Sequence, residues 1–135
     1  MTGDLVPIPG ERPKLLIVDD EEIIRNRLEE LGKSMNLEVY TAEDGVDGVF
    51  AFNEVKPDVV ILDVYMPRKN GLKALQDMKG IDNNVKVILI TGYLRFEQIV
   101  QTGGVGADAY LEKPFNLETM SNLINDMLDE RIATA

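Results

Sequence analysis

Five short apolar runs alternate with segments of helical periodicity along almost the whole chain. In the first run, LLIV at 15–18, the apolar residues are consecutive, as in strands that are buried on both faces of a sheet. Strands that alternate with helices favour parallel pairing through βα units, which predicts an α/β fold of the (βα)5 type. The expected strands cover residues 15–18, 37–41, 58–62, 85–90 and 109–112.

Apolar residues recur at helical spacing after each run. The first helix is expected over about 21–34. In the second helix, at 44–54, we expect Val46, Val49 and Phe50 to face the core. The remaining helices are expected after Asn70-Gly71, at 94–102 and after Asn116, which is the expected N-cap of the last helix.

The composition excludes several classes of site. Without cysteine or histidine, the chain cannot form a disulfide, a common zinc site or a Ser-His or Cys-His catalytic pair. The net charge of −10 argues against binding to nucleic acid or to an acidic membrane surface. No apolar stretch approaches the roughly 18 residues of a membrane span, so we expect a cytoplasmic protein. In a chain of 135 residues, we expect one domain at 13–133 after a flexible leader at 1–12.

Polar side chains stand at the ends of four of the expected strands. Asp19 and Asp20 follow the first strand, Asp63 the third, Thr91 the fourth and Lys113 the fifth. Because the C-terminal ends of parallel strands share one edge of the sheet, we expect these groups in one shallow pocket. Carboxylates beside one ammonium and one hydroxyl suit a divalent cation together with a phosphoryl group.

Four motifs make the chain resemble a response-regulator receiver domain, the phosphate-accepting module of two-component signalling. They are LLIVDDE (15–21), VVILDVYMPRKNG (59–71), VILITG (87–92) and GADAYLEKPF (106–115), and the resemblance extends from about residue 13 to residue 132. It implies a flavodoxin-like, doubly wound parallel sheet with strand order 2-1-3-4-5. Such a protein is an enzyme only toward its own phosphorylation and dephosphorylation.

The resemblance implies that Asp63 is the phosphorylated residue, and a carboxylate at a strand end is well placed for in-line attack on phosphorus. It also implies that Mg²⁺, or Mn²⁺ in its place, is held by Asp20, Asp63 and the backbone carbonyl of Tyr65, and by Asp19 through water. The acidic residues at 19–22 would also favour the start of the first helix, and the two roles are compatible.

Three further residues take roles from the resemblance. Lys113 would neutralise the aspartyl phosphate, and its bond to Pro114 is expected to be cis. Thr91 would donate its hydroxyl to a phosphoryl oxygen, and Tyr110 would swing into the space that Thr91 leaves. The result would be a change on the face formed by helix 4, strand 5 and helix 5.

Two features depart from the commonest receiver pattern. The resemblance implies that Tyr65 and Tyr93 flank the path of the hydrolytic water, where two bulky side chains would crowd it, and a phenol with a pKa of about 10 is no general base near neutral pH. We therefore expect a comparatively long-lived phosphoryl group. Gly103 and Gly104 lie where the helix at 94–102 should end, so we expect this helix to fray and to be ordered by phosphorylation or by a partner.

Other functions fit the residues less well. A phosphotransferase of the haloacid-dehalogenase type needs a second aspartate two residues after its nucleophile, where this chain has Tyr65. A flavodoxin-type FMN carrier needs hydroxyl and amide groups after the first strand, where the acidic residues 19–21 would repel phosphate. The glycines near residues 104 and 106 lack the spacing of a dinucleotide-binding loop.

The partners stay open at this stage. The resemblance implies a sensor histidine kinase or a histidine phosphotransfer protein as phosphoryl donor, met by Ile24, Arg25, Leu28 and their neighbours, and an unknown downstream protein. The short tail after the last helix favours a stand-alone protein, although a receiver excised from a longer regulator would look similar. We expect a monomer, or a weak dimer through helix 4, strand 5 and helix 5.

Overall fold

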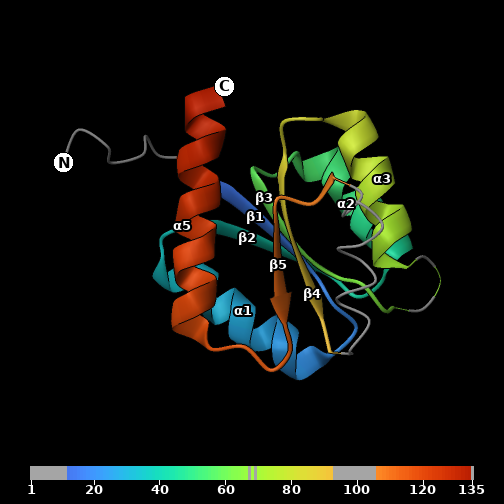
Figure 1. Ribbon diagram of the computed structural model, residues 1–135. Coiled ribbons are helices and arrows are strands. Elements are labelled where there is room, and N and C mark those ends of the chain that lie inside the picture. Colours follow the sequence, from blue (N-terminus) through green and yellow to red (C-terminus); the bar gives the residue numbers. More distant parts are fainter. Residues whose placement is uncertain (1–11, 67, 69, 93–105, 135) are drawn as a thin grey trace.

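The computed structural model describes residues 12–66, 68, 70–92 and 106–134. It contains a five-stranded sheet in the order β2-β1-β3-β4-β5, in which all neighbouring strands are parallel (Figure 1). The predicted α/β class, flavodoxin-like topology and strand order are confirmed. The strands are β1 (Lys14–Val18), β2 (Glu38–Ala42), β3 (Val59–Asp63), β4 (Lys86–Thr91) and β5 (Ala109–Glu112), and the described helices are α1 (Glu22–Ser34), α2 (Gly45–Val55), α3 (Gly71–Ile81) and α5 (Leu117–Thr134).

Some sequence predictions fall on parts of the chain that the structure does not describe. The expected leader is described only at Arg12. The expected helix at 94–102 lies outside the described residues, as do Tyr93, Gly103 and Gly104. None of the described helices is long and apolar enough to cross a lipid bilayer.

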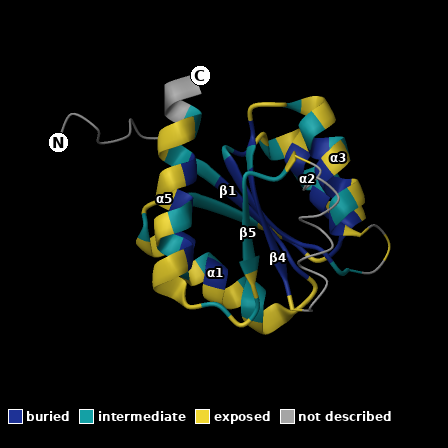
Figure 2. Cartoon of the chain, in the orientation of Figure 1, coloured by how far each residue is buried: buried dark blue, intermediate teal, exposed yellow. Residues whose placement is uncertain are grey.

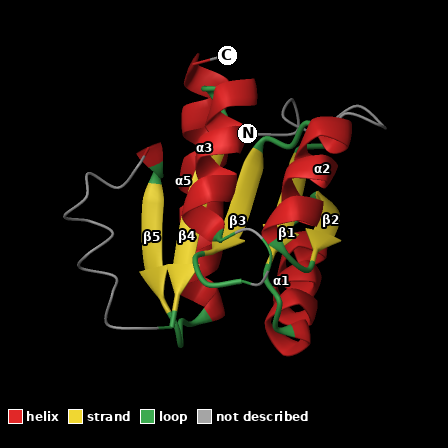
Figure 3. Cartoon of the chain, turned by 90° about the vertical axis from the view of Figure 1, so that its right-hand side faces the viewer, coloured by secondary structure: helices red, strands yellow, loops and turns green. Residues whose placement is uncertain are grey.

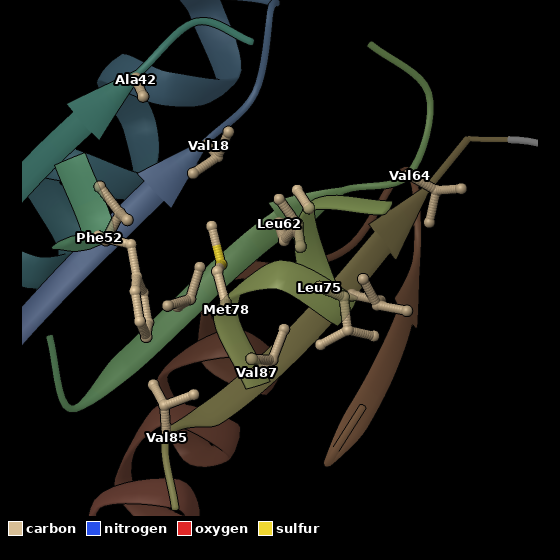
Figure 4. Packing of buried hydrophobic residues seen from close by; sticks show 13 residues of the cluster. Val18, Ala42, Phe52, Leu62, Val64, Leu75, Met78, Val85 and Val87 are labelled. Atoms are coloured by element: carbon tan, nitrogen blue, oxygen red, sulfur yellow. The ribbon is translucent and has the colours of Figure 1, made fainter. Parts of the chain in front are cut away.

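The core consists of two apolar layers, one on each face of the sheet. Successive strand residues point to opposite faces, so the consecutive apolar residues of β1, β3 and β4 supply both layers (Figure 2). Helices α2 and α3 cover one face, where Phe52 and Met78 pack on Val18, Leu62 and neighbouring side chains (Figure 4). The other layer includes Leu15, Ile17, Leu28, Ile61, Ile88, Ile90, Met120 and Ile124 from the sheet, α1 and α5.

The inward face of α2 differs from the predicted one. Val46 and Phe50 are 40% and 68% exposed, whereas Phe52 is almost fully buried. Gly48 faces the sheet, and a Cβ built on it would lie 2.9 Å from Cγ1 of Val18. The helix therefore approaches β1 through Gly48. The prediction that Val46 and Phe50 face the core is wrong, because it assumed that the largest apolar residues of α2 mark the buried side.

Side-chain caps begin three of the helices. Asn116 accepts a hydrogen bond from the backbone N–H of Thr119 (2.7 Å), which confirms the predicted cap of α5. Asp44 caps α2 and Asn70 caps α3 in the same way. Glu21 precedes α1 without a side-chain capping bond, so its carboxylate is left to act elsewhere.

Candidate functional site

The predicted site residues meet at one edge of the sheet, at the C-terminal ends of the strands (Figure 3). Asp19 follows β1, Asp63 and Thr91 end β3 and β4, and Lys113 follows β5. The side chains of Asp19, Asp63 and Thr91 are buried, with 0%, 4% and 1% of their residue surface exposed. A parallel register carries each strand to the same edge, which is why residues far apart in sequence share this position.

Lys113 connects the acidic groups. Its Nζ lies 2.7 Å from Oε1 of Glu21, 2.9 Å from Oδ2 of Asp19 and 3.3 Å from Oδ2 of Asp63. Its backbone N–H donates to the carbonyl of Thr91 (2.7 Å), which ties the loop after β5 to the end of β4. The Lys113–Pro114 peptide bond is cis, as predicted.

Backbone groups hold the two buried carboxylates in place. Asp19 accepts a hydrogen bond at Oδ1 from the N–H of Glu21 (2.8 Å), and its carbonyl accepts one from the guanidinium of Arg25 (2.9 Å). Asp63 accepts a hydrogen bond at Oδ1 from the N–H of Tyr65 (3.3 Å). Each carboxylate therefore keeps one oxygen on the backbone and directs the other toward Lys113.

Burial dominates the electrostatics of the site. The pKa of Asp63 is raised to about 7, chiefly by burial and also by the neighbouring charge of Asp19, while Lys113 and the backbone hydrogen bond from Tyr65 oppose the shift. Burial also raises the pKa of Asp19. Burial alone would lower the pKa of Lys113, but its close contacts with the carboxylates of Glu21 and Asp19 outweigh that effect and keep the pKa above its ordinary value. Two crowded carboxylates thus share one firmly protonated lysine.

The donor set fits a hard divalent cation. Asp19, Asp20 and Asp63 each offer a carboxylate oxygen within 4.8 Å of the others. Oδ2 of Asp19 is buried, and although it forms an ion pair with Lys113, no described residue donates an aligned hydrogen bond to it. Oxygen ligands alone, with one exposed carboxylate at the entrance, are the chemistry that Mg²⁺ prefers.

An open pocket of about 630 Å³ lies above these groups. Asp20, Glu21 and Ile24 line it on one side, and Tyr65 and Pro114 line it elsewhere. Tyr65 is therefore at the site, as the sequence predicted.

The two residues of the predicted switch lie in neighbouring strands. Thr91 is buried at the end of β4. Tyr110 is half-buried in β5, opposite Leu89, and packs against the apolar layer under α2 and α3. Burial raises the pKa of its phenol, so the ring carries no charge near neutral pH.

The candidate contacts on α1 need correction. Leu28 is fully buried in the core, and Arg25 is turned inward to Asp19 and Glu43. Ile24 does line the open pocket, and Ile23 beside it is 70% exposed. Any partner that meets the start of α1 thus finds Ile23 and Ile24 rather than Leu28.

Sequence reasoning missed two residues at this edge. The sequence places Glu21 beside the acidic pair and at the start of the first helix, but nothing in it indicates the contact of Glu21 with Lys113, 92 positions away. Gly71 begins α3, and a Cβ on it would overlap the backbone of Asp63 and Val64. The Asn-Gly pair at 70–71 signalled only a turn, whereas the structure requires glycine there because the chain returns to within contact of β3.

The family model described as the response regulator receiver domain matches residues 15–125. The regulatory protein AtoC of Escherichia coli is 34% identical over 85% of this chain, which spans only 25% of that relative's length. The chemotaxis protein CheY of Halobacterium salinarum is 33% identical over 85% of this chain and 96% of its own.

Among solved structures, a response regulator receiver domain protein from Clostridium thermocellum is 30% identical, with a TM-score of 0.85 over 91% of this chain and 99% of that one. The family model, the two relatives and this structure agree with one another. Receiver domains are signalling modules of two-component systems rather than enzymes in the ordinary sense. The chain belongs to the response regulator receiver domain family.

Proposed function

We propose that the protein accepts a phosphoryl group on Asp63 from a phosphohistidine of a sensor kinase or a histidine phosphotransfer protein. The observation that carries this proposal is the position of Asp63, buried at a strand end yet lining the open pocket, 3.3 Å from Lys113. A carboxylate oxygen of Asp63 attacks phosphorus, and the P–N bond of the phosphohistidine breaks. The imidazole nitrogen leaves with the bonding electron pair and takes up a proton.

The residues around Asp63 would bind the cation, neutralise the phosphoryl group and transmit the change. Asp20, Asp63 and the carbonyl of Tyr65, with Asp19 through water, would hold a Mg²⁺ ion, which supplies charge neutralisation for the transferring group. Lys113 neutralises a phosphoryl oxygen as a point charge. Thr91 donates a hydrogen bond from its hydroxyl to another phosphoryl oxygen. Tyr110 then swings into the space that Thr91 leaves. This movement alters the face that contains β5 and α5, where a downstream partner would bind.

The phosphoryl donor would dock at the start of α1 and the loop that follows β5. Ile23 is exposed there, and Leu117 at the start of α5 is 40% exposed. Between these elements lies a small hollow lined by Ile24, Arg27 and Phe115. Apolar side chains around the entrance of a polar pocket suit a protein partner that brings its phosphohistidine to Asp63.

The test is the intact mass of the protein after incubation with acetyl phosphate, with and without Mg²⁺. We expect a gain of one phosphoryl group that requires Mg²⁺ and disappears in Asp63→Asn. The control variant is Asp58→Asn, because Asp58 precedes β3 at the opposite edge of the sheet. No gain in the wild type, with acetyl phosphate or with a phosphohistidine donor, would contradict the proposal.

Tyr65 bears on how long the phosphoryl group persists. Its side chain lines the pocket, and a phenol is no general base near neutral pH, so we expect slow hydrolysis of the phosphoryl group on Asp63. Replacing Tyr65 and Tyr93 together by asparagine should accelerate the loss of phosphate, measured by mass after the donor is removed. An unchanged rate would show that these side chains do not limit the access of water.

A further inference from the structure

Lys113 is held by a third carboxylate that the phosphoryl chemistry does not need. Its contact with Glu21, at 2.7 Å, is shorter than its contacts with Asp19 and Asp63. The three partners differ in exposure, because Asp19 and Asp63 are buried whereas the side chain of Glu21 is 59% exposed. Glu21 is therefore the exposed member of the three, and it lines the open pocket beside Asp63.

A phosphoryl group would change the charge in this pocket. Phosphorylation adds about 1.5–2 negative charges near neutral pH, and the new oxygens lie beyond Asp63, toward the pocket. The ammonium of Lys113 has three N–H donors, and its three partners in the unphosphorylated protein are Glu21, Asp19 and Asp63. A phosphoryl group offers several anionic oxygens in place of the single oxygen of Asp63, so it competes with Glu21 for these donors, and the carboxylate of Glu21 would also repel the incoming oxygens.

We propose that Glu21 is a positioning residue that holds Lys113 in the unphosphorylated protein and competes with the phosphoryl group for its ammonium. This inference rests on the proposed function. Glu21 lowers the stability of the phosphorylated state relative to the unphosphorylated one, because phosphorylation breaks its ion pair and places like charges together. Its position just before α1, without a capping hydrogen bond, leaves its carboxylate available for this contact.

The neighbouring residue supplies a matched control. Glu22 is also exposed, also acidic and only one position further along the chain. Glu21→Gln and Glu22→Gln change the net charge equally, but only Glu21→Gln removes a carboxylate that contacts Lys113. Any difference between the two variants therefore reports the contact and not the overall charge.

Two measurements test the proposal. The first is the dissociation constant for beryllofluoride, a phosphoryl analogue, at fixed MgCl₂, followed by NMR. We expect Glu21→Gln to bind it about fivefold more tightly than Glu22→Gln, the upper range for a solvent-accessible ion pair, with the difference shrinking as KCl rises to 0.5 M. The second is the rate of hydrogen exchange at Nζ of Lys113, measured without any phosphoryl analogue. The Lys113→Arg variant identifies the signal of this ammonium. Exchange should be faster than in the wild type for Glu21→Gln but not for Glu22→Gln.

The outcomes separate this inference from the proposed function. Equal affinity in the two variants, or weaker binding in Glu21→Gln, overturns the competition between Glu21 and the phosphoryl group. Unchanged exchange at Lys113 overturns the ion pair itself. If the wild type neither binds beryllofluoride nor gains a phosphoryl group, the proposed function is overturned as well. If the wild type is phosphorylated but the two variants have the same affinity for beryllofluoride, only the role of Glu21 is overturned.

Discussion

A few charged side chains determine the electrostatics at the C-terminal edge of the sheet. Asp63 is buried beside Asp19, and one lysine serves both. As the proposed phospho-acceptor, Asp63 lies close to other carboxylates that could bind a cation, and this closeness costs stability when no cation is bound. The conflict leads to a prediction about Asp63 itself.

We expect Asp63→Asn to be more stable than the wild type without Mg²⁺, by about 1–3 kcal/mol at pH 8. The folded protein raises the pKa of Asp63 to about 7, above its ordinary value of 3.8, chiefly through burial. Between these two pH values the folded state binds the proton more tightly than the unfolded state. Wild-type stability should therefore fall from about pH 4 to pH 7, and the advantage of the variant should shrink toward pH 4.

Urea unfolding at several pH values measures this advantage. Asp58→Asn serves as the comparison, because Asp58 precedes β3 at the edge of the sheet opposite the site. A constant difference between Asp63→Asn and the wild type from pH 4 to pH 8 would contradict the argument.

Gly71 carries a second residue-scale prediction. Gly71→Ala would force a Cβ into the backbone of Asp63 and Val64, so we expect a loss of at least about 2 kcal/mol in the free energy of unfolding. Gly80→Ala, in the same helix, has open space around the new methyl group and should gain about 0.5 kcal/mol. Denaturant unfolding of both variants tests the pair, and a neutral Gly71→Ala would show that β3 and α3 can separate without cost.

At the scale of elements, α2 offers a direct test of which side faces the core. Phe52→Ala removes a buried ring and should lower the free energy of unfolding by about 3–5 kcal/mol. Phe50→Ala, two positions earlier, removes a mostly exposed ring and should change it by less than about 0.5 kcal/mol. Thermal or urea unfolding distinguishes them, and similar losses in both variants would restore the predicted face with Phe50 inward.

The same helix shows what the sequence could predict about this fold and what it could not. Continuous apolar runs, strand-end polar residues and the cap at Asn116 are local signals, and each led to a correct element or position. The orientation of α2 depends on how closely Gly48 approaches Val18, which is a property of two elements together. The contact of Glu21 with Lys113 joins loops 92 positions apart and has no local signal at all.

For the whole molecule, the site residues stand at the ends of β1, β3, β4 and β5, so a ligand that bound them would stabilise the folded state. Without a cation, the clustered carboxylates of Asp19, Asp20 and Asp63 oppose folding in a chain whose net charge is already −10. A cation that binds only the folded state adds stability in proportion to the logarithm of its concentration above the dissociation constant.

We therefore expect MgCl₂ to raise the melting temperature, with about 1.4 kcal/mol of added stability when its concentration is tenfold above the dissociation constant. Ionised carboxylates are required, and the pKa of Asp63 is about 7, so the effect should grow from pH 6 to pH 8. KCl at equal ionic strength controls for screening, and Asp63→Asn should lose most of the Mg²⁺ effect. If KCl matched MgCl₂, general screening of the negative charge would explain the stabilisation, and the carboxylates at the sheet edge would not form a metal site.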